Sequence, residues 1–413
     1  MPVQNPATLK NAPWLNHPSL QKLFAVMNEG EQETRVVGGA VRNHLLGESV
    51  TDIDLATPLS PHKVIERAEQ AGFKTIPTGV DHGTVTLVIS GQSYELTSLR
   101  KDIKTDGRHA VVEFGTDWRE DASRRDFTIN ALYVSHDGTL HDPLGTGQDD
   151  LKARKLRFIG SPQQRIKEDY LRTLRFYRLA AQYSQAPFDS AAISATIKCR
   201  KGLTGLSPER VLNELIKLLI APRADQILSL LYQNGLLSQI LASAPKIIPA
   251  LRGIDIENHL KISPNPMFRL MLLAVHHQGD IKKLRTRLKL SNAQEKTLQM
   301  CQAYKALPPL EIGKADDHHK SHYSLGTKAY TLAFLTKWAI GKKAINDKSL
   351  TQFFQKETNQ VGTRFPLSGK DLINAGVEPG PDLGQKLKAL ERLWLEKNMA
   401  LTAEELLQKL ETL

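Results

Sequence analysis

The stretch RVVGGAVRNHLLGESVTDIDLAT, residues 35–57, decides which fold the first part of this chain adopts. It places two glycines and an arginine ahead of Asp52 and Asp54, which lie two residues apart. On a strand, this spacing directs both carboxylates to one face of the sheet. Two carboxylates on one face repel each other unless a cation neutralises them or one takes up a proton. The pair therefore indicates a site for Mg²⁺, which prefers carboxylate ligands together with substrate phosphates.

The residues ahead of this pair suit a phosphate. Gly38 and Gly39 follow a strand pattern at 35–37 and open a helix, and backbone N–H groups at such a junction form an anion nest. Arg42, one turn further on, can add a bidentate phosphate contact. The stretch has neither the GK[ST] of a P-loop nor the GxGxxG of a dinucleotide fold. The alternative is a plain strand-to-helix turn with surface aspartates, but the ordered combination favours two metal ions that act on a phosphoryl group.

Strand patterns are concentrated in the first part of the chain. Residues 84–90 and 94–99 flank a Ser-Gly-Gln-Ser turn and predict a hairpin, and residues 62–71 predict a short helix. Residues 30–150 therefore predict a small mixed sheet with a few helices. After about residue 150, apolar residues recur at three- and four-residue spacing, which is typical of helices. The predicted fold class is α+β, with a sheet-bearing head followed by an all-helical body.

The bulk composition narrows the class of protein. The chain has 413 residues, too many for one compact core, so we expect two or more domains. A net charge of +11 favours a polyanionic partner such as nucleic acid. No apolar run reaches the roughly 20 residues of a membrane span, and residues 1–23 carry no secretory or transit signal, so we expect a cytoplasmic protein. Cys199 and Cys301 suit neither a disulfide framework nor a metal site.

The motifs GGAVRNHLLG and DIDLAT together resemble the signature of nucleotidyltransferases with a polymerase-β-like head. Within that group the chain resembles the class II CCA-adding tRNA nucleotidyltransferases and their bacterial poly(A) polymerase relatives. The resemblance implies an enzyme that adds C and A to the 3′ end of tRNA from CTP and ATP, releases pyrophosphate and uses no nucleic-acid template. It implies two Mg²⁺ ions as cofactor and tRNA as partner, with neither a membrane nor an obligate protein partner. One departure is Asn43, where the family usually has Asp.

The resemblance also implies how the chain is divided. We expect an N-terminal extension at 1–30, a nucleotidyltransferase head at 31–150, a helical neck with the base-reading helix at 151–225, and a helical, tRNA-binding body and tail at 226–413. The connector DPLGTGQDDL supports a boundary near residue 150, because its Gly, Pro and Asp residues suit a loop.

The segment ASRRDFTINALY, residues 122–133, is a second candidate for ligand contact. Two adjacent arginines ahead of an apolar helix are unfavourable at a helix N-terminus unless an anion lies nearby. The alternative is a solvated first turn. The segment resembles the family's RRDF-T-x-N-A motif, which implies that Arg125, Asp126 and Asn130 contact the ribose and triphosphate of the nucleotide.

Residues 167–178, KEDYLRTLRFYR, carry a third charged pattern. On a helix, Asp169, Arg172 and Arg175 lie along one stripe, and the alternative is a solvated face of ion pairs. Cytosine and adenine present an amino donor beside a ring-nitrogen acceptor, an order that uracil and guanine reverse, so one carboxylate beside one guanidinium would accept C and A. The segment resembles the family's E-D-x-x-R motif, which implies that Asp169 and Arg172 read the base and that Glu168 orients Arg172.

Glu95, on the second arm of the predicted hairpin, is a candidate third carboxylate. Heads of this type often place a carboxylate on a neighbouring strand, where it supports a metal or takes the hydroxyl proton. The alternative is a solvated glutamate on a half-buried strand.

Two basic stretches are candidates for RNA contact. The charge-rich segment 99–114 resembles the family's flexible loop and contains Arg108. Residues 282–289, KKLRTRLK, form a basic helical pattern that either solubilises the body or meets the RNA backbone. The candidate side chains there are Lys282, Lys283, Arg285 and Arg287.

Two other functions compete with CCA addition. The nearer one is a poly(A) polymerase or an enzyme that adds only A. The other is a non-catalytic RNA-binding protein with a vestigial head, and the intact Asp52 and Asp54 argue against it.

Overall fold

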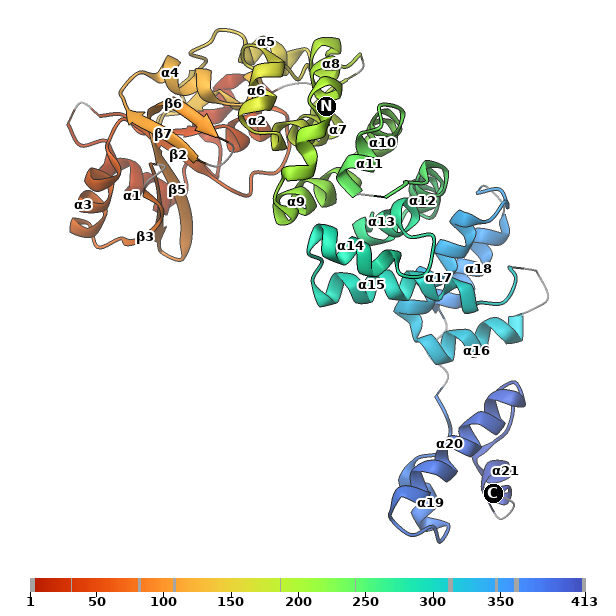
Figure 1. Cartoon of the computed structure of the whole chain (residues 1–413). Coiled ribbons are helices and arrows are strands. Elements are labelled where there is room, and N and C mark those ends of the chain that lie inside the picture. The colour runs from red at the N-terminus through yellow and green to blue at the C-terminus, as the bar shows by residue number, and fades with distance from the viewer. Residues whose placement is uncertain are drawn as a thin grey trace. The chain divides into compact units, whose positions relative to one another are not determined.

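The computed structural model of the chain describes residues 4–30, 32–80, 83–106, 109–185, 187–241, 243–310, 315–345, 348–359 and 364–410. They divide into two compact units, Met1–Ile240 and Leu241–Leu413 (Figure 1). The predicted boundaries after residues 30, 150 and 225 stay predictions.

The first unit is built on a seven-stranded mixed sheet. Its strands lie in the order β3 (Lys74–Gly79), β4 (Thr84–Ile89), β5 (Gln92–Ser98), β2 (Asp54–Thr57), β1 (Arg35–Val37), β8 (Tyr133–Val134) and β9 (Leu140–His141). β2 and β5 run parallel, and the other neighbours run antiparallel. Burial alternates along β4, as the period of a strand requires. The predicted hairpin and the predicted α+β class are confirmed.

Short helices flank this sheet. α1 (Pro18–Met27) and α3 (Pro61–Gln70) pack together, and α3 also contacts β3 and β4. α2 (Gly39–Leu45) follows β1 directly, because Gly38 adopts a φ of +76° that favours glycine and turns the chain into the helix. α2 ends at Leu45, and Gly47 follows its C-cap as the C′ residue, with a typical φ of +72°.

The segment at 99–114, which resembles a flexible loop in the sequence, contains a separate two-stranded sheet. β6 (Arg100–Asp106) pairs antiparallel with β7 (His109–Phe114). Arg108 lies outside the described residues.

Helices dominate the chain after the sheet. In the first unit they are α4 (Trp118–Arg124), α5 (Gly147–Lys152), α6 (Pro162–Glu168), α7 (Leu171–Tyr183), α8 (Ser190–Lys198), α9 (Pro208–Leu219), α10 (Ala224–Gln233) and, at its end, α11 (Leu236–Leu241). α7 packs against α9, where Arg175 and Arg178 of α7 lie close to Glu214 of α9.

The second unit is helical throughout its described residues. It contains α12 (Ile247–Leu260), α13 (Pro266–Ala274), α14 (Asp280–Leu288), α15 (Asn292–Gln302), α16 (Ala315–Leu325), α17 (Thr327–Ile340), α18 (Lys348–Asn359), α19 (Gly369–Asn374), α20 (Pro381–Glu396) and α21 (Ala403–Gln408). α12, α13, α15 and α17 share a core in which Phe268, Tyr330 and Trp338 are almost fully buried. Among helices in the described ranges, none is long and apolar enough to span a lipid bilayer.

Candidate nucleotidyl-transfer site

Three exposed carboxylates gather at the start of β2. Asp54 is the first residue of β2 and lies beside Glu95 of β5 in parallel register, so both side chains project from the same face. Asp52 precedes the strand, so the expectation of a strand holds for Asp54 but not for Asp52. The start of β2 is set by the end of its partner strand. β1 ends at Val37, opposite Asp54, and Gly38 then turns the chain into α2, so the pairing between β1 and β2 stops at Asp54.

The electrostatics of Asp54 suit a cation. Crowding by protein atoms raises the pKa of Asp54 above its usual value, the charges of Glu95 and Asp52 raise it further, and Arg125 and Arg175 oppose the shift. A raised pKa means that the ionised carboxylate lacks sufficient positive partners. Among the described residues, no three His, Cys, Asp or Glu side chains form a metal site by themselves. Mg²⁺ commonly binds through one or two carboxylates plus substrate phosphates, so this acidic set fits that ion only together with a substrate.

A cavity of about 350 Å³ opens beside Asp54 and is lined mainly by cations. Its walls come from the turn between β1 and α2, from the segment after α4, and from α7. The lining residues are Val37, Gly38, Gly39, Arg42, Asp54, Arg124, Arg125, Asp126, Asn130, Arg172, Arg175 and Arg178. Candidate residues predicted from three separate sequence motifs therefore line the same cavity. Asp52, Glu95, Glu168 and Asp169 are not among the residues that line it.

Arg42 is held in the cavity by neutral groups. Its side chain donates to Asn130 Oδ1, to Asn43 Oδ1 at 2.8 Å and to the Tyr183 hydroxyl at 3.1 Å, and the guanidinium lies 4.3 Å from the centre of the Tyr183 ring. Only 7% of Arg42 is exposed. Burial lowers the pKa of Arg42, yet an arginine stays protonated in proteins. A buried cation with neutral partners attracts an anion. The N–H of Gly38 is not part of an anion nest, because it donates to the Leu132 carbonyl at 3.1 Å.

Arg124 and Arg125 lie at the C-terminal end of α4, where cations are favoured. The argument that they are misplaced at a helix N-terminus is therefore wrong, because the helix precedes them. Asp121, fully buried, accepts hydrogen bonds from Arg124 Nε at 2.7 Å, Arg125 Nη2 at 3.0 Å and the Tyr133 hydroxyl at 2.7 Å. Burial alone would lower the pKa of Arg125, but the charges and hydrogen bonds of Asp121 and Tyr133 together outweigh it and raise that pKa. Asp121 thus fixes both guanidinium groups beside the cavity.

Asp126 connects the sheet-bearing part to α7. Its Oδ1 accepts from Asn130 Nδ2 at 3.0 Å, and its Oδ2 accepts from Arg175 Nε at 2.7 Å. Burial raises the pKa of Asp126, but the charge of Arg175 and these hydrogen bonds outweigh it and lower the pKa to about 2. Arg175 also lies 3.8 Å from Glu214 of α9, which accepts from Arg178. Asp126 and Asn130 therefore orient the cations around the cavity.

The predicted single helix for base reading is broken in the structure. α6 ends at Glu168, Asp169 is extended, and α7 begins at Leu171, so Asp169 does not share a helical stripe with Arg172 and Arg175. The break is stabilised because Asp169 Oδ1 accepts from the Leu171 N–H at 3.1 Å, as a cap does.

Both groups proposed to read the base have partners that orient them. Glu168 Oε2 accepts from Arg172 Nη1 at 2.7 Å, in line with the role expected for Glu168, and from Arg165 Nη1 at 2.6 Å. Arg210 of α9 donates to Asp169 Oδ2 at 2.6 Å. Arg172 lines the cavity, and the carboxylate of Asp169 is turned toward Arg210.

Three residues that hold the site were not predicted from the sequence: Asp121, Arg165 and Tyr183. Asp121 and Arg165 had local signals, because Asp121 stands three and four residues before Arg124 and Arg125, and Arg165 stands three residues before Glu168. Tyr183 contacts Arg42, which is 141 positions away in the chain. No local pattern could reveal that contact. Arg210 belongs to the segment Ser-Pro-Glu-Arg at 207–210, which resembles the family's neck-helix motif, and that resemblance implies a segment that braces the base-reading helix.

The predicted basic helix in the second unit is α14. Ile281, Leu284 and Leu288 are buried, and Lys282, Lys283 and Arg285 are exposed on the other face, so the helix is amphipathic. Arg285 donates to Glu295 and to Asn292, and Lys283 lies 3.8 Å from Asp280. Arg287 is half-buried.

Three family models match the chain. The Poly A polymerase head domain matches residues 34–157, the probable RNA and SrmB-binding site of polymerase A matches 188–251, and the putative tRNA nucleotidyltransferase domain 2 matches 265–410. The CCA tRNA nucleotidyltransferase 1, mitochondrial, of Danio rerio is 34% identical over 398 residues, with 94% of this chain and 89% of that protein covered. The CCA-adding enzyme of Lactobacillus delbrueckii subsp. bulgaricus is 30% identical over 381 residues, with 91% of each covered.

Solved structures agree in fold. The Bacillus stearothermophilus CCA-adding enzyme in complex with CTP matches with a TM-score of 0.69 and 25% identity, over 95% of this chain and 96% of that one. The Thermotoga maritima CCA-adding enzyme complexed with tRNA matches with a TM-score of 0.71 and 18% identity, over 100% and 99% of the two chains. The resemblance stated from the sequence motifs is thus confirmed: the chain belongs to the family of the CCA-adding tRNA nucleotidyltransferases.

Proposed function

We propose that this chain adds C and A nucleotides from CTP and ATP to the 3′ end of tRNA, releases pyrophosphate, and uses no nucleic-acid template. The observation that carries the proposal is the juxtaposition of Asp54 and Glu95 with a cavity lined by arginines. A triphosphate needs cations around its oxygens, and its transfer needs carboxylates that bring a divalent ion to the α-phosphate. The names of the relatives, which are CCA-adding enzymes, support the same function.

Arg42 is the cation best suited to take the triphosphate. Six of the described residues that line the cavity are arginines, and five of them are paired with carboxylates: Arg124 and Arg125 with Asp121, Arg172 with Glu168, Arg175 with Asp126, and Arg178 with Glu214. The sixth, Arg42, has only neutral partners. Its charge is therefore available to phosphate oxygens, with Arg125 as a second donor on the same wall.

Asp52 and Asp54 would hold the metal, with Glu95 beside them. When bound, two Mg²⁺ ions supply activation of the 3′-hydroxyl nucleophile and stabilisation of charge on the leaving pyrophosphate. The residues themselves fit this role, since the repulsion among the three carboxylates is relieved when a cation binds. Glu95, adjacent to Asp54 in the sheet, is placed to accept the proton of the hydroxyl or to support the metal.

Asp169 and Arg172 would select the base. A carboxylate has about four lone-pair positions, so Asp169 can accept from the amino group of C or A while it still accepts from Arg210 and the Leu171 N–H. Arg172, held by Glu168, would donate to the neighbouring ring nitrogen. Uracil and guanine place a carbonyl oxygen where the amino group must be and would meet a carboxylate that cannot donate.

The exposed face of α14, with Lys282, Lys283, Arg285 and Arg287, would meet the phosphate backbone of the tRNA, and Arg108 stays a further prediction. Such contacts give affinity that falls with salt and carry no base sequence. A cytoplasmic location also stays a prediction, because some of the relatives are named as mitochondrial proteins.

The experiment that tests this function supplies tRNA that lacks CCA, Mg²⁺ and each of the four labelled NTPs in turn, and then the four together. We expect CMP incorporation from CTP alone, one AMP after two CMP when ATP is added, and no extension from UTP or GTP. Long A tails on unrelated RNA would instead indicate a poly(A) polymerase. Binding of tRNA with no transfer from any NTP would indicate a binding protein.

A further inference from the structure

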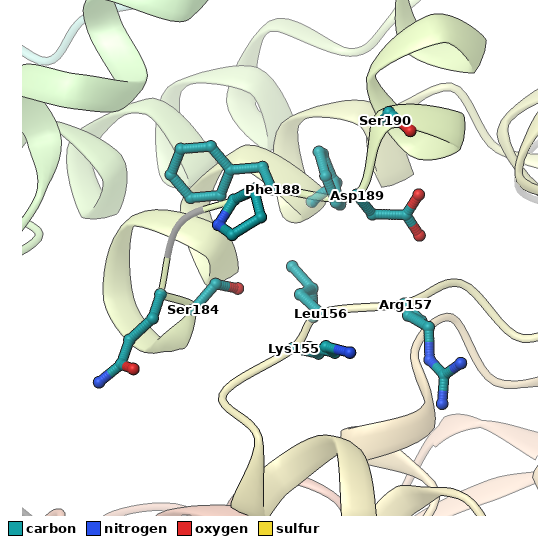
Figure 2. Close-up of a pocket in the computed structure, with 10 residues that line it drawn as sticks. Lys155, Leu156, Arg157, Ser184, Phe188, Asp189 and Ser190 are labelled. Atoms are coloured by element: carbon teal, nitrogen blue, oxygen red, sulfur yellow. The ribbon is translucent and has the colours of Figure 1, made fainter.

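A second cavity in the first unit, outside the nucleotidyl-transfer site, has a volume of about 300 Å³. It lies between the segment at 155–157, which precedes α6, and the residues that join α7 to α8 (Figure 2). Its volume lies at the small end of the range of roughly 300–1,000 Å³ that holds small-molecule ligands, and far above the roughly 30 Å³ that one water occupies.

The inner wall of this cavity is apolar and closely packed. Leu156 is 4% exposed and Phe176 is 1% exposed, and Phe176 is stacked on Phe158 with 5.6 Å between ring centroids. Phe188, half-buried, lines the cavity from the segment before α8 and presents an aromatic ring there (Figure 2). A flat ligand can stack on the half-buried ring of Phe188, while the almost fully buried Phe176 and Leu156 close the inner end of the cavity.

One polar group in the wall has no partner. Ser184, the C-cap of α7, lines the cavity with only 5% of its surface exposed, and its hydroxyl has no hydrogen-bond partner among the described residues. Buried hydroxyl groups are normally satisfied, so an orphaned one indicates that a group from outside the chain completes it. The ligand must therefore carry a hydrogen-bonding atom as well as an apolar surface.

The rim of the cavity is mixed in charge and contains one cation, Lys155, that forms no ion pair with an acidic side chain of the described residues. Arg157 is neutralised by Asp150 at 2.6 Å, and the carboxylate of Asp189 is occupied as the cap of α8, where it accepts from the Ala191 and Ala192 N–H groups. Lys155 itself is exposed. Lys155 can therefore contact a ligand, while Asp150 pairs with Arg157 and Asp189 accepts from backbone N–H groups.

We propose that this cavity binds a single nucleotide unit. The base would lie against Phe176, Phe188 and Leu156, a polar atom on its edge would bond to the Ser184 hydroxyl, and its phosphate would meet Lys155. A nucleotide combines a flat ring for Phe188, a polar edge for the Ser184 hydroxyl and an anion for Lys155. This inference rests on the proposed function in one respect. The proposed function has the same chain handle both free nucleotides and RNA, which are the two possible sources of such a unit.

Photolabelling with 8-azidoadenosine 5′-monophosphate, followed by peptide mapping of the full chain, tests this proposal. We expect label on the peptides that contain residues 155–157 or 184–190. Lys155→Gln and Ser184→Val should each weaken labelling by about tenfold, the effect of one lost charge-assisted or buried hydrogen bond. Lys152→Gln, on the exposed face of α5, is the matched control and should leave labelling unchanged. Lys155 is on the surface, so its variant keeps the proposal testable if Ser184→Val fails to fold.

Competition separates the two sources. Displacement of the label by AMP but not by tRNA lacking CCA supports a free nucleotide, and displacement by that tRNA supports a nucleotide of the RNA strand. No label on these peptides, or label that both variants leave unchanged, overturns the proposal. CMP transfer measured on the same samples reports the nucleotidyl-transfer site alone, so a failure of the proposed function is distinguished from a failure of this inference.

Discussion

Two ion pairs, one in each unit, have similar chemistry and opposite settings. In the first unit Arg175 and Asp126 lie 2.6 Å apart with 34% and 11% of their side chains exposed, on the wall of a cavity. In the second unit Arg269 and Glu257 lie 2.5 Å apart with 3% and 1% exposed. The second pair is closed in a helical core, where Glu257 also accepts from the Asn265 N–H at 2.7 Å.

The difference shows how a chain uses the same pair for two purposes. Burial raises the pKa of Glu257 despite Arg269, as expected for a pair whose cost of desolvation is hardly offset. Around Asp126, by contrast, Arg175 and Asn130 outweigh burial and lower the pKa to about 2, because the site contains an excess of cations. The closed pair serves the fold. The open pair lies on the wall of a cavity that is lined mainly by arginines.

The largest effect is expected for Asp54→Asn. A neutral amide cannot hold a divalent cation beside Glu95, so CMP transfer should fall by about a thousandfold, in the range of losses when one strong electrostatic contact to a transition state is removed. The measurement is CMP incorporation, with tRNA binding measured alongside. Asp149→Asn, on the exposed face of α5, is the control. Transfer within tenfold of the unmodified chain contradicts the role of Asp54.

Glu257→Ala is expected to act on stability alone. It removes the carboxylate that accepts from the buried Arg269, so the free energy of unfolding should fall by about 3–5 kcal/mol. Urea unfolding measures this loss, and CMP transfer per folded molecule should not change. Glu396→Ala, at an exposed position of α20, should have little effect on either. A folded Glu257→Ala protein that cannot transfer CMP would contradict the claim that the Arg269–Glu257 pair affects stability alone.

Arg210→Met is expected to change the choice of base. Asp169 loses the donor that orients it, so the preference for CTP over UTP should fall by about tenfold, while most of the CMP transfer remains. Single-turnover incorporation of CMP and UMP measures the ratio. Arg200→Met, exposed and close in sequence, serves as the control. An unchanged ratio would show that Arg210 only supports the fold.

Asn43→Asp is expected to have the smallest effect. The new carboxylate would pair with Arg42 and reduce the charge available to the triphosphate, so KM for CTP should rise by about threefold with kcat little changed. The substitution restores the residue that the family usually has. It also removes the hydrogen bond from Asn43 to the Ser49 carbonyl, so thermal unfolding is measured to check that the fold is unaltered. A lower KM would contradict the argument that Arg42 binds the phosphates as an unpaired cation.

The sequence predicted those secondary-structure elements that depend on the spacing of neighbouring residues. The strand pattern of β4 and β5, the helix that Gly38 opens and Gly47 closes, and the amphipathic α14 all follow from neighbouring residues. Residues of three distant motifs, among them Gly38, Arg125 and Arg172, line one cavity, and their roles toward a nucleotide stay predictions.

The sequence could not predict features that depend on tertiary packing. The helix predicted at 167–178 breaks at Asp169, since Arg210 of α9 and the Leu171 N–H together satisfy its carboxylate better than a helical position would. The start of β2 at Asp54 depends on where β1 ends. The neutral surroundings of Arg42 depend on Tyr183, which only the fold brings near. These are contacts between residues far apart in the chain.

The most direct test of the account compares the kcat/KM values for CMP and UMP transfer in the unmodified chain and in Asp169→Asn, on tRNA that lacks CCA. Selection by a protein carboxylate predicts that the preference for C over U falls by about 10- to 100-fold, since an amide can donate to the uracil carbonyl. A preference that stays unchanged while transfer remains intact would mean that something other than Asp169 chooses the nucleotide.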